Sequence, residues 1–443
     1  MPGGNPAQTS HIAESTGLAE PASVRWRKPI SIGAPFGRSQ ALVVDGTVCV
    51  EVPGRDVDGD NWEETGHAFV GYDLADGSGA FRVPPAENHV TDLGSDGRFV
   101  YVSTRDGVAA IDPRTGSRRW RADPGMLVRY LVVDGESIRA EVLDEGLRGE
   151  YVRQIGTFDG GTGSYDGRTV RRPNVGGAPA EGQLARRDGR TYALWDGELV
   201  CIDRGEAWAV GIEPNPNVYS LAVTDDGAFA VSKSSSVSTT QPALYRIDPV
   251  TGTTVWRVPL PGSGFDVAAA DGTVFVRADP ADTDVDSILA VGAAEGSKRW
   301  TNHDHEVTSR LTVADGTVYV GRRDGRGPFL SAIDVEDGAE LWRFRVDSVV
   351  GHHPVVLDGV AVLQCVDELV CVESSAPGRT AAEPVGTSSP DAGCPGCGAA
   401  LDGSERFCPA CGEDLTGKAC SECGADLDGS ERFCPSCGNE LGG

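Results

Sequence analysis

Residues 313–343 read VADGTVYVGRRDGRGPFLSAIDVEDGAELWR and show the unit from which most of the chain is built. An Asp-Gly turn leads into an apolar strand, a polar turn, a strand ending in Asp, a Gly-containing turn and a strand bearing Trp-Arg. Residues 95–121, SDGRFVYVSTRDGVAAIDPRTGSRRWR, follow the same order. Asp-Gly between alternating apolar runs is typical of β-hairpins. The two segments therefore predict a repeated antiparallel sheet.

The Asp-Gly pair recurs at a regular interval along the chain. Its positions begin at Asp45, Asp96, Asp134, Asp188, Asp226, Asp271, Asp315 and Asp358. The mean interval of roughly 45 residues suits four short strands, the size of one propeller blade. A closing aromatic residue recurs at Phe81, Trp120, Trp208, Trp256, Trp300 and Trp342, whereas the third repeat has Val170 instead.

The two ends of the repeat region complement each other. The last repeat stops at Glu373 without its Trp-bearing strand, and a spare strand, SVRWRKP with Trp26, lies near the N-terminus. If this strand pairs with the last hairpin, it completes the last blade and closes the ring. The sequence thus predicts an all-β fold, an eight-bladed β-propeller with four-stranded blades, over residues 23–373. Residues 1–22 are predicted to be a disordered N-terminal segment.

Eight of the twelve cysteines lie near the C-terminus in two matched quartets. The quartets, Cys394, Cys397, Cys408 and Cys411, then Cys420, Cys423, Cys434 and Cys437, both have the spacing C-x2-C-x10-C-x2-C. Four thiolates at such spacing favour tetrahedral Zn²⁺, and a Cys₄ site is closed to water and hence structural. A disulfide framework or a redox pair is the alternative. The segment 394–443 resembles the double zinc ribbon, which implies two structural zinc ions. The Pro-, Gly- and Ser-rich residues 374–393 are predicted to be a flexible linker.

The other four cysteines, Cys49, Cys201, Cys365 and Cys371, lie in strand-like runs and are expected to be buried free thiols. In QCVDELVC, a two-residue turn at Asp367-Glu368 would place Cys365 opposite Val370. A disulfide between Cys365 and Cys371 is therefore not expected.

The repeats resemble those of the PQQ-repeat propellers, a superfamily that includes BamB-like assembly proteins and quinoprotein dehydrogenases. The resemblance covers about residues 23–373 and implies the propeller fold. It also implies that enzymes of this kind bind PQQ and Ca²⁺ over the channel, and many have a vicinal disulfide. This chain has no adjacent cysteines, and the enzymes' metal-binding carboxylates find no residue-by-residue match. PQQ is thus not expected here. We expect a non-enzymatic binding or scaffold protein, with a quinone- or small-ligand-binding enzyme or sensor as the alternative.

One polar position recurs five residues before the Asp of each Asp-Gly pair. It holds Gln40, Thr91, Arg129, Gln183, Asp266, Arg310 and His353, and Ser220 takes this place in the fifth repeat, where the register shifts by one. These residues are predicted to begin the innermost strands and to ring the channel mouth. Gln40, Arg129, Gln183, Asp266, Arg310 and His353 are therefore candidate ligand-binding residues, and no catalytic residue is predicted. The alternative is a water-filled channel with polar walls. The acidic runs Asp56–Glu64 and Asp282–Asp286 are read as solvated loops, with Ca²⁺ binding left open.

The charge of the chain bears on its partners. Lys and Arg number 39, Asp and Glu 66, and the net charge is −27. Such a surface repels phosphate backbones, so nucleic acid is not an expected partner and a protein is. The scarcity of Lys and excess of Asp resemble cytoplasmic proteins of extreme halophiles; an ordinary acidic soluble protein is the other reading. With no long apolar stretch and no secretory signal, we expect a cytoplasmic location, no membrane span and a monomeric propeller.

Overall fold

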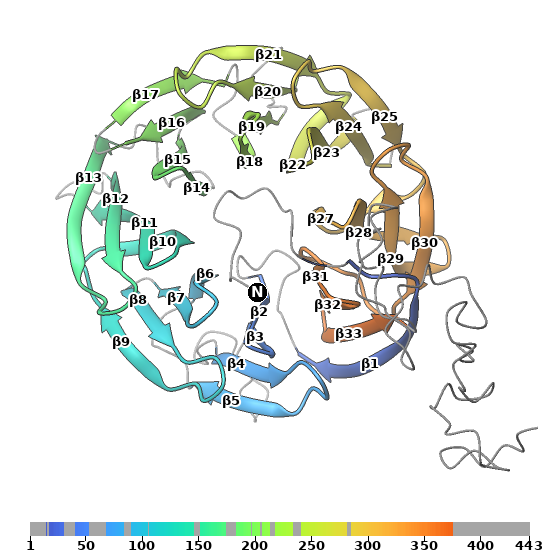
Figure 1. Cartoon of the computed structure of the whole chain (residues 1–443), viewed down its shortest axis with the longest axis horizontal. Coiled ribbons are helices and arrows are strands. Elements are labelled where there is room, and N and C mark those ends of the chain that lie inside the picture. Colours follow the sequence, from blue (N-terminus) through green and yellow to red (C-terminus); the bar gives the residue numbers. More distant parts are fainter. Residues whose placement is uncertain are drawn as a thin grey trace, which may run out of the picture. The chain divides into compact units, whose positions relative to one another are not determined.

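The described part of the chain forms a ring of eight β-sheets (Figure 1). The computed structural model describes residue 15 and residues 17–30, 40–52, 68–83, 90–104, 106–145, 151–173, 183–195, 197–203, 206–212, 218–233, 241–280 and 285–374. Contacts divide the chain into two compact units, Met1–Ala381 and Ala382–Gly443. The described residues belong to the first unit, so residues 375–393 of the predicted linker and the predicted ribbon pair, 394–443, lie outside them.

Each sheet is one blade of antiparallel strands, and in the first seven blades the strand numbers rise from the axis outward. Blade one contains β2 (Leu42–Val44), β3 (Thr47–Val52), β4 (Ala68–Asp73) and β5 (Gly79–Val83), and blade two contains β6 (Val90–Ser95), β7 (Val100–Thr104), β8 (Gly107–Ile111) and β9 (Arg118–Ala122). Blade three contains β10 (Leu127–Asp134), β11 (Ser137–Glu145), β12 (Tyr151–Asp159) and β13 (Tyr165–Pro173). Blade four contains β14 (Leu184–Arg187), β15 (Arg190–Trp195), β16 (Glu198–Ile202) and β17 (Glu206–Gly211).

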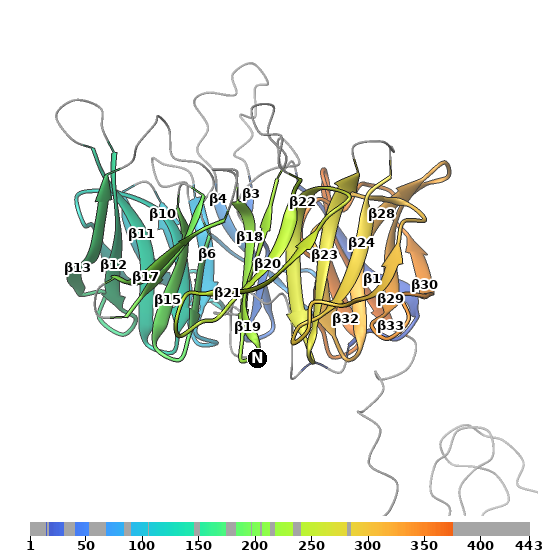
Figure 2. The ribbon, with the colours of Figure 1, turned by 90° about the horizontal axis from the view of Figure 1, so that it is seen from above.

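Blades five and six have the same order, and blade seven has an inner strand split in two. Blade five contains β18 (Val218–Thr224), β19 (Gly227–Ser232), β20 (Ala243–Ile247) and β21 (Thr254–Pro259). Blade six contains β22 (Gly262–Ala270), β23 (Thr273–Pro280), β24 (Ser287–Gly292) and β25 (Lys298–Asn302). Blade seven contains the split inner strand, β26 (Glu306–Val307) and β27 (Thr312–Ala314), followed by β28 (Thr317–Asp324), β29 (Gly327–Asp334) and β30 (Glu340–Arg345). The strands run across the thickness of the ring (Figure 2).

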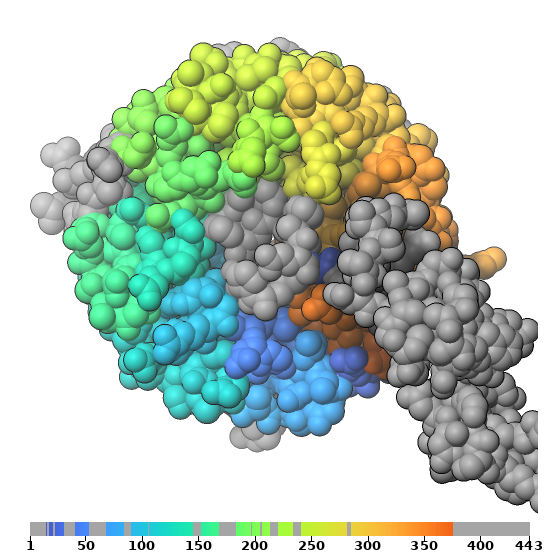
Figure 3. Space-filling view, viewed as in Figure 1, coloured from blue at the N-terminus to red at the C-terminus, as the bar shows by residue number. Residues whose placement is uncertain are grey.

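The eighth blade joins the two ends of the repeat region. It contains β31 (Val355–Leu357), β32 (Val360–Gln364), β33 (Glu368–Ser374) and, outermost, β1 (Pro21–Pro29). β1 pairs antiparallel with β33, and Trp26 lies opposite Cys371. The earliest and latest described residues meet at one place in the ring (Figure 3). The predicted eight-bladed fold, closed by the N-terminal strand, is confirmed.

The N-terminal segment continues the closure beyond β1. Residues 17–22 were predicted to be disordered, but Leu18 is only 3% exposed. The Leu18 backbone N–H donates to the Tyr319 hydroxyl at 2.8 Å, and the Gly359 N–H donates to the Gly17 carbonyl at 2.8 Å. The prediction is thus wrong for these residues, because they gain apolar and hydrogen-bonding partners on blades seven and eight. Residues 1–14 and 16 lie outside the described residues.

Five of the eight Asp-Gly pairs form the predicted two-residue hairpin turns. Asp45, Asp188, Asp271, Asp315 and Asp358 all have positive φ, as do the glycines that follow them. Two successive positive φ angles define the type I′ turn, whose twist matches that of the flanking strands. The remaining three repeats differ. The turns are Gly135–Glu136 and Asp225–Asp226, and a longer connection joins Ser95 to Val100.

The closing aromatic residue of one blade packs on a turn of the next. Trp26 lies against Gly77, where an added Cβ would come within 2.8 Å of the indole, and its Nε1 donates to the Leu74 carbonyl at 2.9 Å. The corresponding Nε1-to-carbonyl bonds are Trp120 to Gly160 (2.8 Å), Trp256 to Ala293 (3.1 Å) and Trp300 to Val335 (2.9 Å). Apolar clusters fill the space between blades, as where Val48 and Val50 meet Val362. Tryptophan thus links neighbouring blades by both apolar contact and hydrogen bonding.

The four cysteines of the propeller are buried and free, as predicted. The predicted register of the last hairpin is wrong, because Gln364 pairs with Leu369 and the turn is Val366–Asp367. No helix occurs in the described ranges, so none there could cross a membrane.

Candidate functional site: the inner wall of the propeller

Asp266 shows how the predicted ring of polar residues is used. It lies on β22 and is 1% exposed. Its Oδ2 accepts the Leu311 backbone N–H of blade seven at 2.8 Å, and its Oδ1 accepts the Ser220 hydroxyl of blade five at 3.1 Å. Ser220 Oγ in turn accepts the Val267 N–H at 3.2 Å. This carboxylate therefore ties three blades together instead of facing an open channel.

Three other predicted residues also contact the backbone of a neighbouring blade. Gln183 Oε1 accepts the Leu221 N–H at 2.7 Å. Thr91 Oγ1 donates to the Val128 carbonyl at 3.1 Å. His353 Nδ1 lies 2.9 Å from the Leu311 carbonyl, so this nitrogen carries the proton.

Sequence reasoning missed three residues of the same kind. Glu51 Oε1 accepts the Val90 N–H at 3.2 Å, Asp92 Oδ2 accepts the Leu131 N–H at 3.0 Å, and Gln364 Oε1 accepts the Ala41 N–H at 2.9 Å. Glu51 and Gln364 share a position that could have been noticed, since each is the fifth residue after the Asp-Gly turn in a strand whose other residues are apolar or small.

We call these side-chain-to-backbone hydrogen bonds the inner belt. Its residues are Glu51, Thr91, Asp92, Gln183, Ser220, Asp266, His353 and Gln364. Among the described residues it connects every pair of neighbouring blades except the third and fourth. There, Arg186 of blade four pairs with Asp134 of blade three at 2.8 Å. Four of the eight belt residues are buried and the other four are partly buried. Buried polar groups stabilise when they are paired and are costly when they are not.

Three of the predicted residues, Gln40, Arg129 and Arg310, lie outside the belt, and their surroundings differ. Gln40 is partly buried before the first inner strand. Arg129 is 6% exposed and stacks on Tyr130, with its Cζ 4.9 Å from the ring centre, while its Nη2 donates to the Tyr130 hydroxyl at 3.1 Å.

Arg310 is the predicted residue that remains accessible, with a side chain 40% exposed. It lies in the break between β26 and β27, where the Ser309 hydroxyl takes the place of a backbone partner and accepts the Gly321 N–H at 2.7 Å. Irregularities of this type re-aim a side chain out of a regular strand. Arg310 Nη1 lies 3.9 Å from Asp266 Oδ1. The broken strand thus presents one cation beside the belt.

The titratable groups near Arg310 are held in unusual protonation states. Burial raises the pKa of Asp92 to about 7, against the lowering effects of the Leu131 and Leu93 N–H groups and of Arg310. Burial, followed by the charges of His353 and Arg310, lowers the pKa of His352 to about 4, and burial also lowers the pKa of His353. Both histidines are therefore neutral at pH 7, and Arg310 carries the positive charge of this cluster.

The described part of the chain holds no group of three His, Cys, Asp or Glu arranged for a metal ion. The predicted cysteine ligands and the acidic run Asp56–Glu64 lie outside it. Of the second acidic run, Asp286 accepts Arg277 Nε at 2.9 Å, whereas Asp282 and Asp284 are outside the described residues.

Comparison with known proteins identifies both kinds of repeat. The family described as outer membrane protein assembly factor BamB matches residues 195–308 and 284–404, and the double zinc ribbon matches residues 394–438. The PQQ-repeat resemblance is confirmed. The ribbon match includes all eight C-terminal cysteines. A comparison with curated proteins finds no match.

Solved structures share the BamB-like fold at low sequence identity. BamB from Moraxella catarrhalis is 16% identical, with a TM-score of 0.55, and the match covers 79% of this chain and 99% of that one. The quinohemoprotein alcohol dehydrogenase of Comamonas testosteroni is 12% identical, with a TM-score of 0.58, covering 85% and 80%. The computationally designed protein Ika8 is 14% identical, with a TM-score of 0.58, covering 80% and 100%. At these identities the likeness shows the fold, which hosts both enzymes and non-enzymes.

Asp266→Ala and Arg310→Ala are expected to differ in stability, because Asp266 belongs to the inner belt and Arg310 does not. Removing the Asp266 carboxylate leaves the Leu311 N–H without its partner, so the free energy of unfolding should fall by about 3 kcal/mol. Arg310→Ala removes a long ion pair, 3.9 Å, made by a side chain that is 40% exposed. The free energy of unfolding should therefore change by about 0.5 kcal/mol or less. Chemical denaturation of the two variants measures both values, and equal losses would contradict the distinction.

Asp92→Asn is expected to change the pH dependence of stability. Because the pKa of Asp92 is raised to about 7 in the folded protein, the folded state binds a proton that the unfolded state releases above about pH 4. Wild-type stability relative to the Asn variant should therefore fall as pH rises from 4 to 7. The prediction concerns the difference between wild type and variant because His352, whose pKa is lowered, makes the stability of both proteins rise with pH. This contribution cancels in the difference. A difference independent of pH would contradict this prediction.

Proposed function

We propose that this chain is a non-enzymatic binding or scaffold protein, with its propeller as a docking platform. The inner belt is the observation that supports this most. Groups such as Asp266 and Gln183, at positions where a ligand-binding channel would present free polar groups, are bonded to neighbouring blades. A belt of this kind makes the ring rigid and leaves its loops and faces for partners.

We further propose that the C-terminal ribbons are a second docking module, held by two structural zinc ions. Two Cys₄ sets offer the soft, closed donor environment that zinc prefers. Residues 394–443 carry nine acidic and three basic residues, a balance that suits a protein partner better than nucleic acid. The proposal retains the cytoplasmic location and monomeric propeller expected from the sequence.

Affinity capture from native lysate at high salt tests this function. The full chain should retain a protein in stoichiometric amount, and a chain ending at residue 393 should retain less or none of it. Arg310→Ala in the full chain is the matched control and should retain as much as wild type. Retention of nucleic acid that falls steeply with salt, in place of a protein, would contradict the proposal.

A second candidate function rests on Arg310. This accessible cation acts electrostatically on Asp92, whose pKa is raised to about 7, and on two neutral histidines. Such a cluster could bind a small anionic ligand, a quinone included, in an enzyme or sensor. BamB and a quinohemoprotein dehydrogenase both share this fold, so the fold does not distinguish a scaffold from an enzyme or sensor. A measurement of small-ligand binding does.

A further inference from the structure

Blade seven buries an entire arginine. Arg322 of β28 is 0% exposed. It is the sixth residue after its Asp-Gly turn, and the residues at this place in the other blades with a type I′ turn are Val52, Trp195, Ala278 and Cys365. All four are also buried. The fold therefore accepts an apolar side chain here, and the charge is a property of blade seven alone among these five blades.

The guanidinium of Arg322 lacks partners for most of its N–H groups. Its Nη2 donates to Asn302 Oδ1 at 2.6 Å, while Nε and Nη1 have no acceptor. Among the described residues it forms no ion pair. Burial lowers the pKa of Arg322 only to about 10, so the group keeps its charge at pH 7. Buried N–H groups of a cation that find no acceptor are strongly unfavourable.

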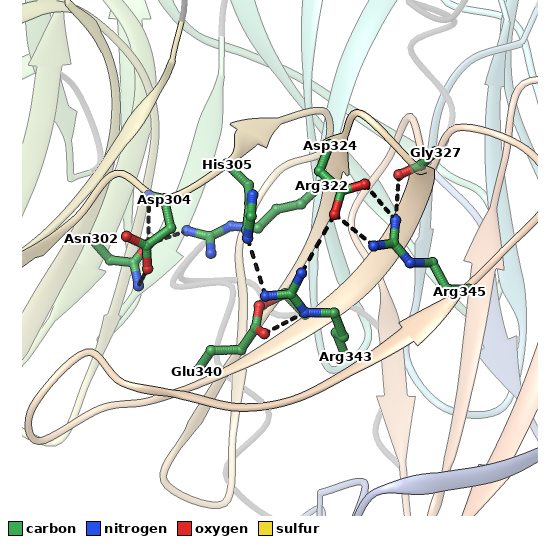
Figure 4. Close-up of polar contacts among 10 residues, drawn as sticks. Asn302, Asp304, His305, Arg322, Asp324, Gly327, Glu340, Arg343 and Arg345 are labelled. Carbon is green, nitrogen blue, oxygen red and sulfur yellow. Dashed lines mark hydrogen bonds and ion pairs between the residues drawn. The ribbon is translucent and has the colours of Figure 1, made fainter.

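Three carboxylates belong to the same cluster, but each has another donor (Figure 4). Glu340 Oε1 accepts Arg343 Nε at 2.6 Å. Asp324 accepts two N–H groups of Arg345, at 2.7 and 2.6 Å. Asp304 Oδ2 lies 3.3 Å from a side-chain amide nitrogen. The protein thus supplies charge near Arg322 but no acceptor for its free N–H groups.

His305 belongs to the same cluster and is neutral. Arg343 Nη2 lies 3.1 Å from His305 Nε2, and because arginine only donates, Nε2 is the acceptor and the imidazole is neutral. Burial, then Arg343 and Arg322, lowers the pKa of His305. Glu340 and Asp324 act on it in the opposite direction. The acceptor nitrogen of His305 is occupied by Arg343 and is not available to Arg322.

We propose that Arg322 holds a small monatomic anion, chloride under ordinary conditions, enclosed in blade seven. The anion accepts the free N–H at Nε or Nη1, which no carboxylate of the cluster does. A monatomic ion is the occupant because Arg322 is wholly screened from solvent, so its ligand is enclosed with it and carries no attached partner. The site is independent of the inner belt and of the proposed docking function.

Bromide replaces chloride and scatters anomalously, so crystals of the full chain grown in bromide test the site directly. An anomalous peak in contact with Nε or Nη1 of Arg322 is expected. Absence of a peak there, or a water molecule in its place, would overturn the proposal.

Thermal unfolding supplies a second test in solution. Bromide replaces glutamate at constant ionic strength, and the midpoint for wild type should rise relative to that of Arg322→Met as bromide increases. Arg323→Met is the matched control, because Arg323 is on the same strand but 51% exposed and paired with Glu306. This control should follow wild type. A constant difference between wild type and Arg322→Met would refute the site, and the crystals decide if that variant does not fold.

Discussion

Trp26→Ala is expected to lower the free energy of unfolding by about 4 kcal/mol, because it removes the aromatic side chain that links the eighth blade to the first. Trp26 is 7% exposed, packs on Gly77 and donates its indole N–H to the Leu74 carbonyl. It also lies on β1, which comes from the other end of the repeat region and pairs with β33. Its loss therefore weakens both the blade interface and the closure of the ring. Denaturant unfolding followed by fluorescence and circular dichroism measures the effect.

Trp26→Phe is the matched control for this experiment. Phenylalanine keeps an aromatic ring against Gly77 and loses only the hydrogen bond to Leu74, so the expected loss is about 1 kcal/mol. The structure already has a phenylalanine in the equivalent place, where Phe81 lies against Gly116. If Trp26→Ala were as stable as wild type, the N-terminal strand would not hold the ring closed.

Removal of zinc is expected to unfold the C-terminal ribbon pair and leave the propeller intact. Metal binding supplies about 10–16 kcal/mol of apparent free energy in small zinc domains, which have too little core to fold alone. Elemental analysis should find two zinc ions per chain in the wild type. Cys408→Ser and Cys434→Ser each remove one thiolate from one quartet, and each variant should retain one zinc.

The propeller serves as the internal control for zinc removal, since its four cysteines are buried and free. Burial raises the pKa of Cys49 to about 12 and that of Cys201 to about 11, so these thiols are poor metal ligands. A chelator should therefore leave the unfolding transition of the propeller unchanged. Wild-type protein with no zinc, or disulfides within the quartets, would contradict the assignment.

The architecture could be predicted because it depends on local signals that repeat. Asp315 and Gly316 adopt the type I′ turn that their residue types favour, and the same pair does so in four other blades. The closure could be predicted because a strand is missing at one end and present at the other. Trp26 identifies that strand, and its pairing with β33 follows.

The role of the inner wall could not be predicted, because it depends on which way a side chain turns. Sequence spacing placed Asp266 and His353 at the start of inner strands, but a polar residue there can face the axis or the adjacent blade. The neighbouring backbone decides, since the Leu311 N–H and carbonyl both need partners. The break between β26 and β27 also has no local signal in the sequence. It is nevertheless the reason that Arg310 alone is accessible among the charged residues of the predicted set.

The most direct test of a binding platform against an enzyme is equilibrium binding of PQQ with Ca²⁺ to the purified full chain, followed by a dye-linked alcohol oxidation assay. Our account predicts no saturable binding and no turnover, for wild type and Arg310→Ala alike. One equivalent of PQQ bound per chain, with turnover that Arg310→Ala abolishes, would contradict it and assign the inner wall to catalysis.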